Sequence, residues 1–253
     1  GRIKLFLKSN IEPSEILCLR FSEKAAKDIR ERIEDDPEIK ENNMDISEIE
    51  ISTYHAFCRK ILLENSTSTG LAMKGGIMDR SVFLAWGVQN IDEFGFDEYV
   101  VMVNNEFEII EKIIDGISVF NQQLISPDDL EKYVEDKLTG NLQIADDEEQ
   151  DYVHQLKNLV RVYKKYVEFK KEIDVMDYDD LIIEFNNLVS NNSKVKESLQ
   201  SKFKHILIDE FQDNNFAQFE IVKKIAKDGN VTAVGDADQN IYTFQGAYRG
   251  IFE

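Results

Sequence analysis

Short apolar runs of strand length lie near both ends of the chain, and polar or amphipathic sequence follows each of them. We predict strands at 15–21, 49–53, 205–209 and 231–235. Helices with apolar residues at three- to four-residue spacing are predicted from Ser22 to about Ile33, from Tyr54 to Glu64 and from about Asn215 to Ile225. Because strands alternate with helices, both ends predict parts of a parallel sheet that helices cover on both faces.

The middle of the chain has a different pattern. From about Ser81 to Lys171, apolar residues recur at helical spacing and strand-like runs are scarce. Ser126-Pro127 is typical of a helix start, because proline fits the first turn and acidic residues follow it. We interpret the segment as an all-helical insertion, with an acidic loop at 140–150. The expected domains are a first core part, the insertion and a second core part, at 1–80, 81–171 and 172–253.

Composition predicts a folded, intracellular, soluble protein. The 253 residues include 42% apolar residues and only 12 Gly and three Pro, enough for one large domain or two modest ones. No apolar stretch reaches the roughly 20 residues of a membrane span, and no charged leader precedes an apolar segment. The two cysteines, Cys18 and Cys58, form neither a disulfide framework nor a metal-ligand pattern. We expect Cys58 and Trp86 in the core.

The formal charge of −19 argues at first against nucleic acid, which proteins bind through contacts of Lys and Arg with phosphates. However, residues 91–156 hold 18 acidic and only three basic residues. The rest of the chain has 31 acidic and 27 basic residues and is close to neutral. The acidity therefore gathers in the middle segment, and it does not exclude a DNA-binding surface on the flanking parts.

The strongest chemical signal is the pair Asp209-Glu210 at the end of the apolar run 205–209. Parallel sheets bind their ligands at the carboxyl ends of the strands, so two carboxylates here fit a site. Asp209 can hold a Mg²⁺ ion that bridges nucleotide phosphates, and Glu210 can deprotonate the attacking water. A strand that runs into an acidic turn is the simpler alternative. Gln212 and Asp213 continue the polar cluster and favour a site.

A second signal follows the run 231–235, where a Gly-Asp turn leads into further polar and aromatic residues. Gln239 can reach a terminal phosphate from such a turn. Tyr242 and Phe244 can offer aromatic faces to nucleic-acid bases. Aromatic residues two positions apart also fit the core and the surface of a single strand, so the spacing alone leaves both interpretations open.

Five short motifs together resemble the UvrD/Rep/PcrA family of superfamily-one helicases, and they follow the family's order. They are Phe-Ser-Glu-Lys-Ala-Ala from Phe21, Thr-Tyr-His from Thr53, Asp-Tyr-Asp-Asp-Leu from Asp177, Asp-Glu-Phe-Gln-Asp from Asp209 and Gly-Asp-Ala-Asp-Gln-Asn-Ile-Tyr from Gly235. The last two match the family's Walker B segment, Asp-Glu-x-Gln-Asp, and its next motif, Gly-Asp-x-Asp-Gln-x-Ile-Tyr. The resemblance implies a RecA-like α/β core of the P-loop NTPase type with a helical insertion.

The resemblance also implies an activity and its residues. The full-length protein would be an ATP-dependent DNA helicase that uses ATP and Mg²⁺ to move on single-stranded DNA, 3′ to 5′, up to a duplex junction. Asp209 would bind Mg²⁺, Glu210 would be the catalytic base and Gln239 would sense the γ-phosphate. The implied nucleotide contacts are Gln212, Asp236 and Gln239. The implied single-strand track is Phe21, His55, Tyr242 and Phe244. A helix start with a packing aromatic would equally explain Asp177, Tyr178 and Asp180.

The sequence departs from the family in several places. It contains no Gly-x-x-x-x-Gly-Lys-Thr/Ser loop, whose backbone N–H groups and lysine cradle phosphates. We therefore expect a fragment of a longer protein, inactive alone for lack of this loop and of a second RecA-like domain. Arg20 replaces the usual Thr, Phe244 the usual Trp, and Gln245 the usual Arg.

Two other functions remain as alternatives. One is the motor part of an AddA/RecB-like helicase-nuclease, and the other is a non-catalytic helicase-like binding module. The Asp209, Glu210 and Gln239 set argues against a module, because a scaffold needs no hydrolytic residues. The acidic insertion is a poor surface for duplex DNA, so we expect it to face solvent or a protein partner.

Overall fold

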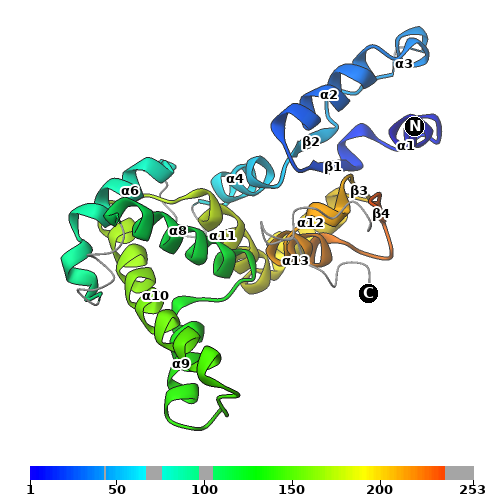
Figure 1. Cartoon of the computed structure of the whole chain (residues 1–253). Coiled ribbons are helices and arrows are strands. Elements are labelled where there is room, and N and C mark those ends of the chain that lie inside the picture. The colour runs from blue at the N-terminus through cyan, green and yellow to red at the C-terminus, as the bar shows by residue number, and fades with distance from the viewer. Residues whose placement is uncertain (43, 67–75, 97–104, 237–253) are drawn as a thin grey trace. The chain divides into compact units, whose positions relative to one another are not determined.

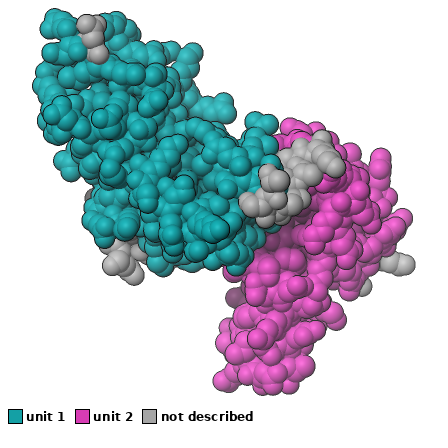
Figure 2. All heavy atoms as spheres, turned by 180° about the vertical axis from the view of Figure 1, so that it is seen from behind, with its two compact units in different colours: residues 1–70, 181–253 teal, residues 71–180 magenta. Residues whose placement is uncertain are grey.

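The computed structural model describes residues 1–42, 44–66, 76–96 and 105–236, which form two compact units. Unit 1 is made of residues 1–70 and 181–253, and unit 2 of residues 71–180 (Figure 2). Unit 1 contains a parallel sheet and unit 2 is built of helices (Figure 1). Within the described ranges, no helix is both long enough and apolar enough to cross a membrane.

The predicted parallel sheet is confirmed in unit 1. Its four strands lie in the order β2-β1-β3-β4, and every neighbouring pair is parallel. The strands are β1 (Ile16–Arg20), β2 (Glu50–Thr53), β3 (His205–Ile208) and β4 (Val231–Ala233). Each lies within its predicted run. The central strand β1 is buried over Ile16, Leu17, Cys18 and Leu19, as expected for a strand with sheet neighbours on both sides.

Most helices of unit 1 begin where the sequence provides a capping side chain. Ser22 accepts a hydrogen bond from the Ala25 N–H at 3.2 Å, and Asn215 accepts one from the Gln218 N–H at 2.9 Å. These starts agree with the prediction. The α-helices are α1 (Arg2–Lys8), α2 (Glu23–Glu34), α3 (Pro37–Glu41), α4 (Tyr54–Glu64), α11 (Tyr178–Asn191, in unit 1 from Leu181), α12 (Ser193–Lys202) and α13 (Phe216–Ile225). Two 3-10 turns are η1 (Pro13–Glu15) and η3 (Phe211–Asp213).

Alternate residues of the strands enter two different packing layers. Ile16, Cys18 and Leu207 pack with Ile3 of α1 and Ala26 of α2 on one face of the sheet. The intervening strand residues point to the opposite face, because side chains alternate along a strand. A second apolar layer of unit 1 centres on Phe57 of α4, whose ring lies 5.5 Å from that of Phe185 and 5.8 Å from that of Phe203.

Unit 2 has a largely helical architecture. Its elements are α6 (Arg80–Gln89), η2 (Ile91–Phe94), α8 (Glu106–Gln122), α9 (Pro127–Leu138) and α10 (Asp147–Glu172). Stacked aromatic rings join α6 to α10: Phe83 lies 3.6 Å from Tyr166, and Trp86 lies 4.7 Å from Phe169. Trp86 is only partly buried, whereas Cys58 in unit 1 is fully buried.

The predicted acidic loop at 140–150 is wrong at its carboxyl end. Helix α10 begins at Asp147, so the last four residues of that range are helical. The Asp146 side chain caps the helix by accepting a hydrogen bond from the Glu149 N–H at 2.8 Å. The acidic side chains of the first turn interact favourably with the positive end of the helix dipole. The run of acids therefore stabilises a helix start rather than a loop.

Two helix glycines of unit 2 differ in the space around them. A Cβ atom on Gly87 of α6 would lie 2.5 Å from Cγ2 of Ile110, a fully buried residue of α8. A Cβ atom on Gly116 of α8 would meet Leu159 at an ordinary 3.5 Å. Only at Gly87 does the packing require glycine.

We therefore expect Gly87→Ala to lower the free energy of unfolding by about 1 kcal/mol, because the added methyl overpacks the contact with Ile110. The matched variant Gly116→Ala should raise it by about 0.5–1 kcal/mol through helix propensity. Thermal or denaturant unfolding of both variants measures the difference. Equal effects of the two substitutions would contradict the close approach of α6 and α8.

Candidate functional site

Four strand ends meet at the carboxyl edge of the sheet in unit 1. Phe21 follows β1, and His55 lies one residue into the helix that follows β2. Asp209 and Glu210 follow β3, and Asp236 follows β4 after a short extended segment. Since all four strands are parallel, these residues lie along one edge, where α/β proteins bind ligands. Asp209, Glu210 and Asp236 thus share this edge with Phe21 and His55.

Glu210 has a backbone conformation that is rare for its residue type. Its φ angle is 52°, in the left-handed region. The Val234 N–H donates to the Ile208 carbonyl, as in a regular parallel ladder. The Val234 carbonyl, however, accepts from the Phe211 N–H, where a regular ladder would use the N–H of Glu210. Glu210 is thus an extra residue in a local bulge. Such a conformation costs on the order of 1–3 kcal/mol and persists where surrounding contacts hold it.

The contacts that hold Glu210 come from the buried side chain of Gln212, which is 2% exposed. Its Nε2 donates to Oε2 of Glu210 at 2.7 Å, and its Oε1 accepts from the Asp236 N–H at 3.0 Å. Gly235 makes this close approach feasible, because a Cβ there would lie 2.6 Å from the same Oε1 atom. Gln212 therefore connects the Glu210 carboxylate to the segment after β4.

Asp213 lies on the other side of the same turn. Its Oδ1 atom is buried and has no hydrogen-bond partner among the described residues. Burial, and next the negative charge of Glu210, raise the pKa of the Asp213 carboxyl above its ordinary value. In the acidic turn after β3, the Glu210 carboxylate is thus hydrogen-bonded to Gln212, whereas Oδ1 of Asp213 has no hydrogen bond among the described residues.

A buried hydrogen bond joins the turn after β3 to the start of α4. Nδ2 of Asn214 donates to the Tyr54 hydroxyl oxygen at 2.6 Å, and the two residues are 0% and 1% exposed. Oδ1 of Asn214 has no partner in the described part of the chain. Tyr54 directly precedes His55, so this bond connects the acidic turn to the segment that carries a predicted DNA residue.

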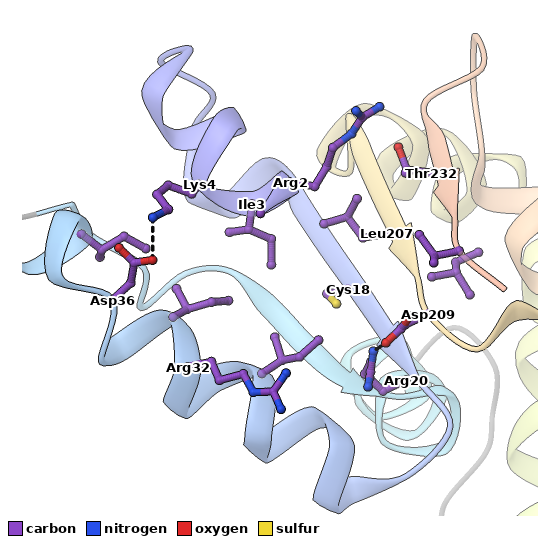
Figure 3. Close-up of a pocket in the computed structure, with 16 residues that line it drawn as sticks. Arg2, Ile3, Lys4, Cys18, Arg20, Arg32, Asp36, Leu207, Asp209 and Thr232 are labelled. Carbon is purple, nitrogen blue, oxygen red and sulfur yellow. Dashed lines mark ion pairs between the residues drawn. The ribbon is translucent and has the colours of Figure 1, made fainter.

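Arg20 is a site residue that the sequence interpretation missed. The register places Leu19 beside Ile208, so the next pair on the same face of the sheet is Arg20 and Asp209. Their side chains form an ion pair between Nη1 of Arg20 and Oδ2 of Asp209 (Figure 3). The sequence shows a cation at the end of a predicted strand. Only the register of β1 and β3 shows that this cation lies beside Asp209.

The ion pair lines a pocket of about 400 Å³ on the face of the sheet beside α1, α2 and α3 (Figure 3). Apolar residues from the sheet and from these helices form much of its wall. Arg2, Lys4 and Arg32 add further positive charge, and Lys4 is paired with Asp36 at 2.7 Å.

The donor atoms at this edge fit Mg²⁺. Asp209 offers hard carboxylate oxygens, and its side chain is 37% exposed. Across the described ranges, no group of three or more His, Cys, Asp or Glu residues gathers around a common point. Mg²⁺ commonly binds through one or two carboxylates, with water and substrate phosphates as the remaining ligands, and a single carboxylate at this edge fits that pattern.

Three predicted site residues, Gln239, Tyr242 and Phe244, lie outside the described residues. Of the other predicted DNA residues, Phe21 is 46% exposed and His55 is partly buried. Phe21 thus exposes nearly half of its surface next to the carboxyl edge of the sheet.

The Asp-Tyr-Asp-Asp segment in unit 2 forms a helix start. Oδ1 of Asp177 accepts from the Asp180 N–H, and Oδ2 of Asp180 accepts from the Asp177 N–H, both at 2.8 Å. Lys170, which is 5% exposed, pairs with Asp177 at 2.8 Å and with Asp180 at 2.7 Å. Burial, and then the charge of Asp177, raise the pKa of Asp179 to about 6. The geometry supports the structural interpretation of this motif.

The parallel sheet, its covering helices and the polar residues after its strands are consistent with a RecA-like α/β fold. The chain belongs to the family described as the UvrD/REP helicase N-terminal domain, which it matches over residues 2–253.

The chain is similar to several curated bacterial helicases over nearly its whole length. It is 29% identical over 249 residues to a "Probable DNA helicase II homolog" of Mycoplasma capricolum, with 96% of the chain and 30% of the relative covered. Identity is 27% over 244 residues to "ATP-dependent DNA helicase Rep" of Buchnera aphidicola, covering 93% and 32%. For "ATP-dependent DNA helicase PcrA" of Staphylococcus aureus it is 30% over 250 residues, covering 95% and 29%. The chain thus spans about a third of each relative.

For the buried link of Tyr54 and Asn214, we expect Tyr54→Phe to lower the free energy of unfolding by about 1–3 kcal/mol, because the Asn214 amide loses its acceptor. Adding Asn214→Leu should recover part of this loss, since both polar groups are then gone. The exposed Tyr152→Phe serves as control and should have little effect. A double variant no more stable than Tyr54→Phe would contradict the direct bond.

For the buried cluster of unit 2, Asp179 has a folded-state pKa raised from 3.8 to about 6, so its stabilising contribution is lost as pH rises through that window. Asp179→Asn should therefore stabilise the protein by about 1–2 kcal/mol near pH 8 and by much less near pH 4. Denaturant unfolding at both pH values measures this, with Asp92→Asn at an exposed position as control. A pH-independent effect would count against the raised pKa.

Proposed function

We propose that the intact protein is an ATP-dependent DNA helicase or translocase that couples ATP hydrolysis to movement on single-stranded DNA, 3′ to 5′. The observation that carries the proposal is the carboxylate of Glu210, fixed by Gln212 beside Asp209 at the carboxyl edge of the sheet. Membership in the UvrD/REP family supports it. The relatives are named as helicases, which favours neither a helicase-nuclease nor a non-catalytic module.

In this proposal the residues at the edge divide the chemistry between them. Asp209 holds Mg²⁺, which when bound neutralises phosphate charge. Glu210 accepts the proton of the attacking water, and Gln212 keeps the carboxylate oriented for that task. Asp236 and Gln239 contact the nucleotide, and Gln239 senses the γ-phosphate. The strained backbone of Glu210 is consistent with a residue whose position is set by function rather than by local preference.

The DNA residues in this proposal are Phe21, His55, Tyr242 and Phe244. Phe21 and His55 follow neighbouring strands, so a single strand that runs along the sheet edge can meet both. Aromatic stacking contributes about 1–3 kcal/mol per base and tolerates any sequence. This tolerance suits an enzyme that moves along DNA.

We assign unit 2 to the helical insertion of the family and propose a protein partner rather than duplex DNA for its acidic α9–α10 region. The second half of α9, the following loop and the first turns of α10 expose apolar side chains among many acids. These side chains are Tyr133 (37% exposed), Leu138 (42%), Leu142 (42%) and Tyr152 (51%). Apolar residues ringed by acids suit a basic protein surface better than phosphates.

The decisive substitution is Glu210→Gln in the intact protein. It keeps the size of the side chain but removes the proton acceptor, so DNA-stimulated ATP hydrolysis should fall by about 10²–10⁴-fold. Binding of ATP, measured with a fluorescent nucleotide, should persist. Steady-state ATPase assays with and without single-stranded DNA give the comparison.

Glu197→Gln on the exposed face of α12 is the matched control and should leave the turnover unchanged. A wild-type intact protein that binds single-stranded DNA but hydrolyses no ATP would favour the binding-module alternative. Turnover that survives Glu210→Gln would exclude Glu210 as the base.

A further inference from the structure

The ion pair of Arg20 and Asp209 is built into the sheet rather than into a loose surface loop. Arg20 is the last residue of the central strand β1, and the parallel register sets it beside Asp209 on the same face. The Arg20 side chain is 12% exposed and that of Asp209 is 37% exposed. The guanidinium is thus the more buried partner, and the carboxylate keeps one side open to the pocket.

A buried guanidinium needs a counter-ion, because desolvation without a partner is costly. In the described part of the chain, Asp209 is the carboxylate that forms an ion pair with Arg20. The other cations of the pocket come from helices: Arg2 and Lys4 from α1, with Lys4 paired with Asp36, and Arg32 from α2 (Figure 3). Arg20 is therefore the cation that acts directly on the proposed metal ligand.

We propose that Arg20 is a positioning residue that competes with the divalent cation for Asp209 and so weakens binding of the metal. This inference rests on the proposed function, in which Asp209 is the Mg²⁺ ligand. An oxygen atom engaged by a guanidinium is a poorer ligand for a second cation, and two positive charges at one carboxylate repel each other. The competition raises the metal concentration that the protein requires.

The phosphates of a nucleotide change this balance. A guanidinium binds phosphate oxygens as readily as it binds carboxylates, so a nucleotide provides Arg20 with a second anionic partner. The arrangement therefore favours the metal when it arrives together with a nucleotide. Metal binding without nucleotide should be weak in the wild-type protein and should improve when the charge of residue 20 is removed.

The test is direct measurement of Mn²⁺ binding to the intact protein by electron paramagnetic resonance, with and without ADP. Arg20→Met removes the charge and keeps an aliphatic side chain, whereas Arg20→Lys keeps the charge. Arg32→Met is the matched control, because Arg32 lines the same pocket without an ion pair to Asp209. Circular dichroism and the unfolding midpoint establish that each variant is folded.

Without ADP, we expect Arg20→Met to bind Mn²⁺ about five- to tenfold more tightly than wild type, a moderate factor because solvent partly screens the pair. With ADP present, the difference in Mn²⁺ affinity between Arg20→Met and wild type should be smaller. Arg20→Lys should stay within about twofold of wild type, and Arg32→Met should match it. In an Asp209→Asn background, Arg20→Met should bring no gain.

The outcomes separate this inference from the proposed function. Unchanged or weaker Mn²⁺ binding in Arg20→Met, in a protein that still hydrolyses ATP, overturns the competition alone. If Arg20→Met still tightens Mn²⁺ binding in the Asp209→Asn background, the proposed competition is also overturned, because the charge of Arg20 would then act on the metal without Asp209. A wild-type protein that neither binds Mn²⁺ with ADP nor hydrolyses ATP overturns the proposed function, and this inference with it.

Discussion

The parallel pairing of β1 with β3 is the constraint on which the rest of the structure depends. It buries the central strand and brings the ends of separate chain segments, nearly 190 residues apart, to one edge. It also fixes which side chains become neighbours there, since a shift by one residue would move Asp209 to the other face. The pairing thus determines both the apolar core and the charges of the site.

The site combines a strained backbone with a network that restrains it. Glu210 occupies the left-handed region as an extra residue in the β3–β4 ladder, and the side-chain amide of Gln212 donates to its carboxylate. Gln212 can do so because Gly235 leaves room for its amide. The Gln212 side chain and the bulge after β3, together with Gly235 after β4, therefore set the direction of the Glu210 carboxylate. Under the proposed function, this arrangement would preorganise the base that accepts the proton of the attacking water.

Much of the fold could be predicted from sequence because its signals are local. Short apolar runs bounded by polar residues gave the four strands, and the capping residue Ser22 gave the start of α2. The acidic run at 147–150 was misassigned, because the same residues suit a loop and a first helical turn. The role of Arg20 and the contacts of Gln212 depend on register and on tertiary packing, which no local pattern encodes.

The hydrogen bond between Asn214 and Tyr54 links the turn after β3 to the start of α4, which follows β2. Both side chains are enclosed, so water cannot replace the bond if the segments separate. A displacement of the turn after β3 must therefore either break this bond or shift the first turn of α4, and His55 with it. This enclosed contact thus ties the position of the turn after β3 to that of the first turn of α4.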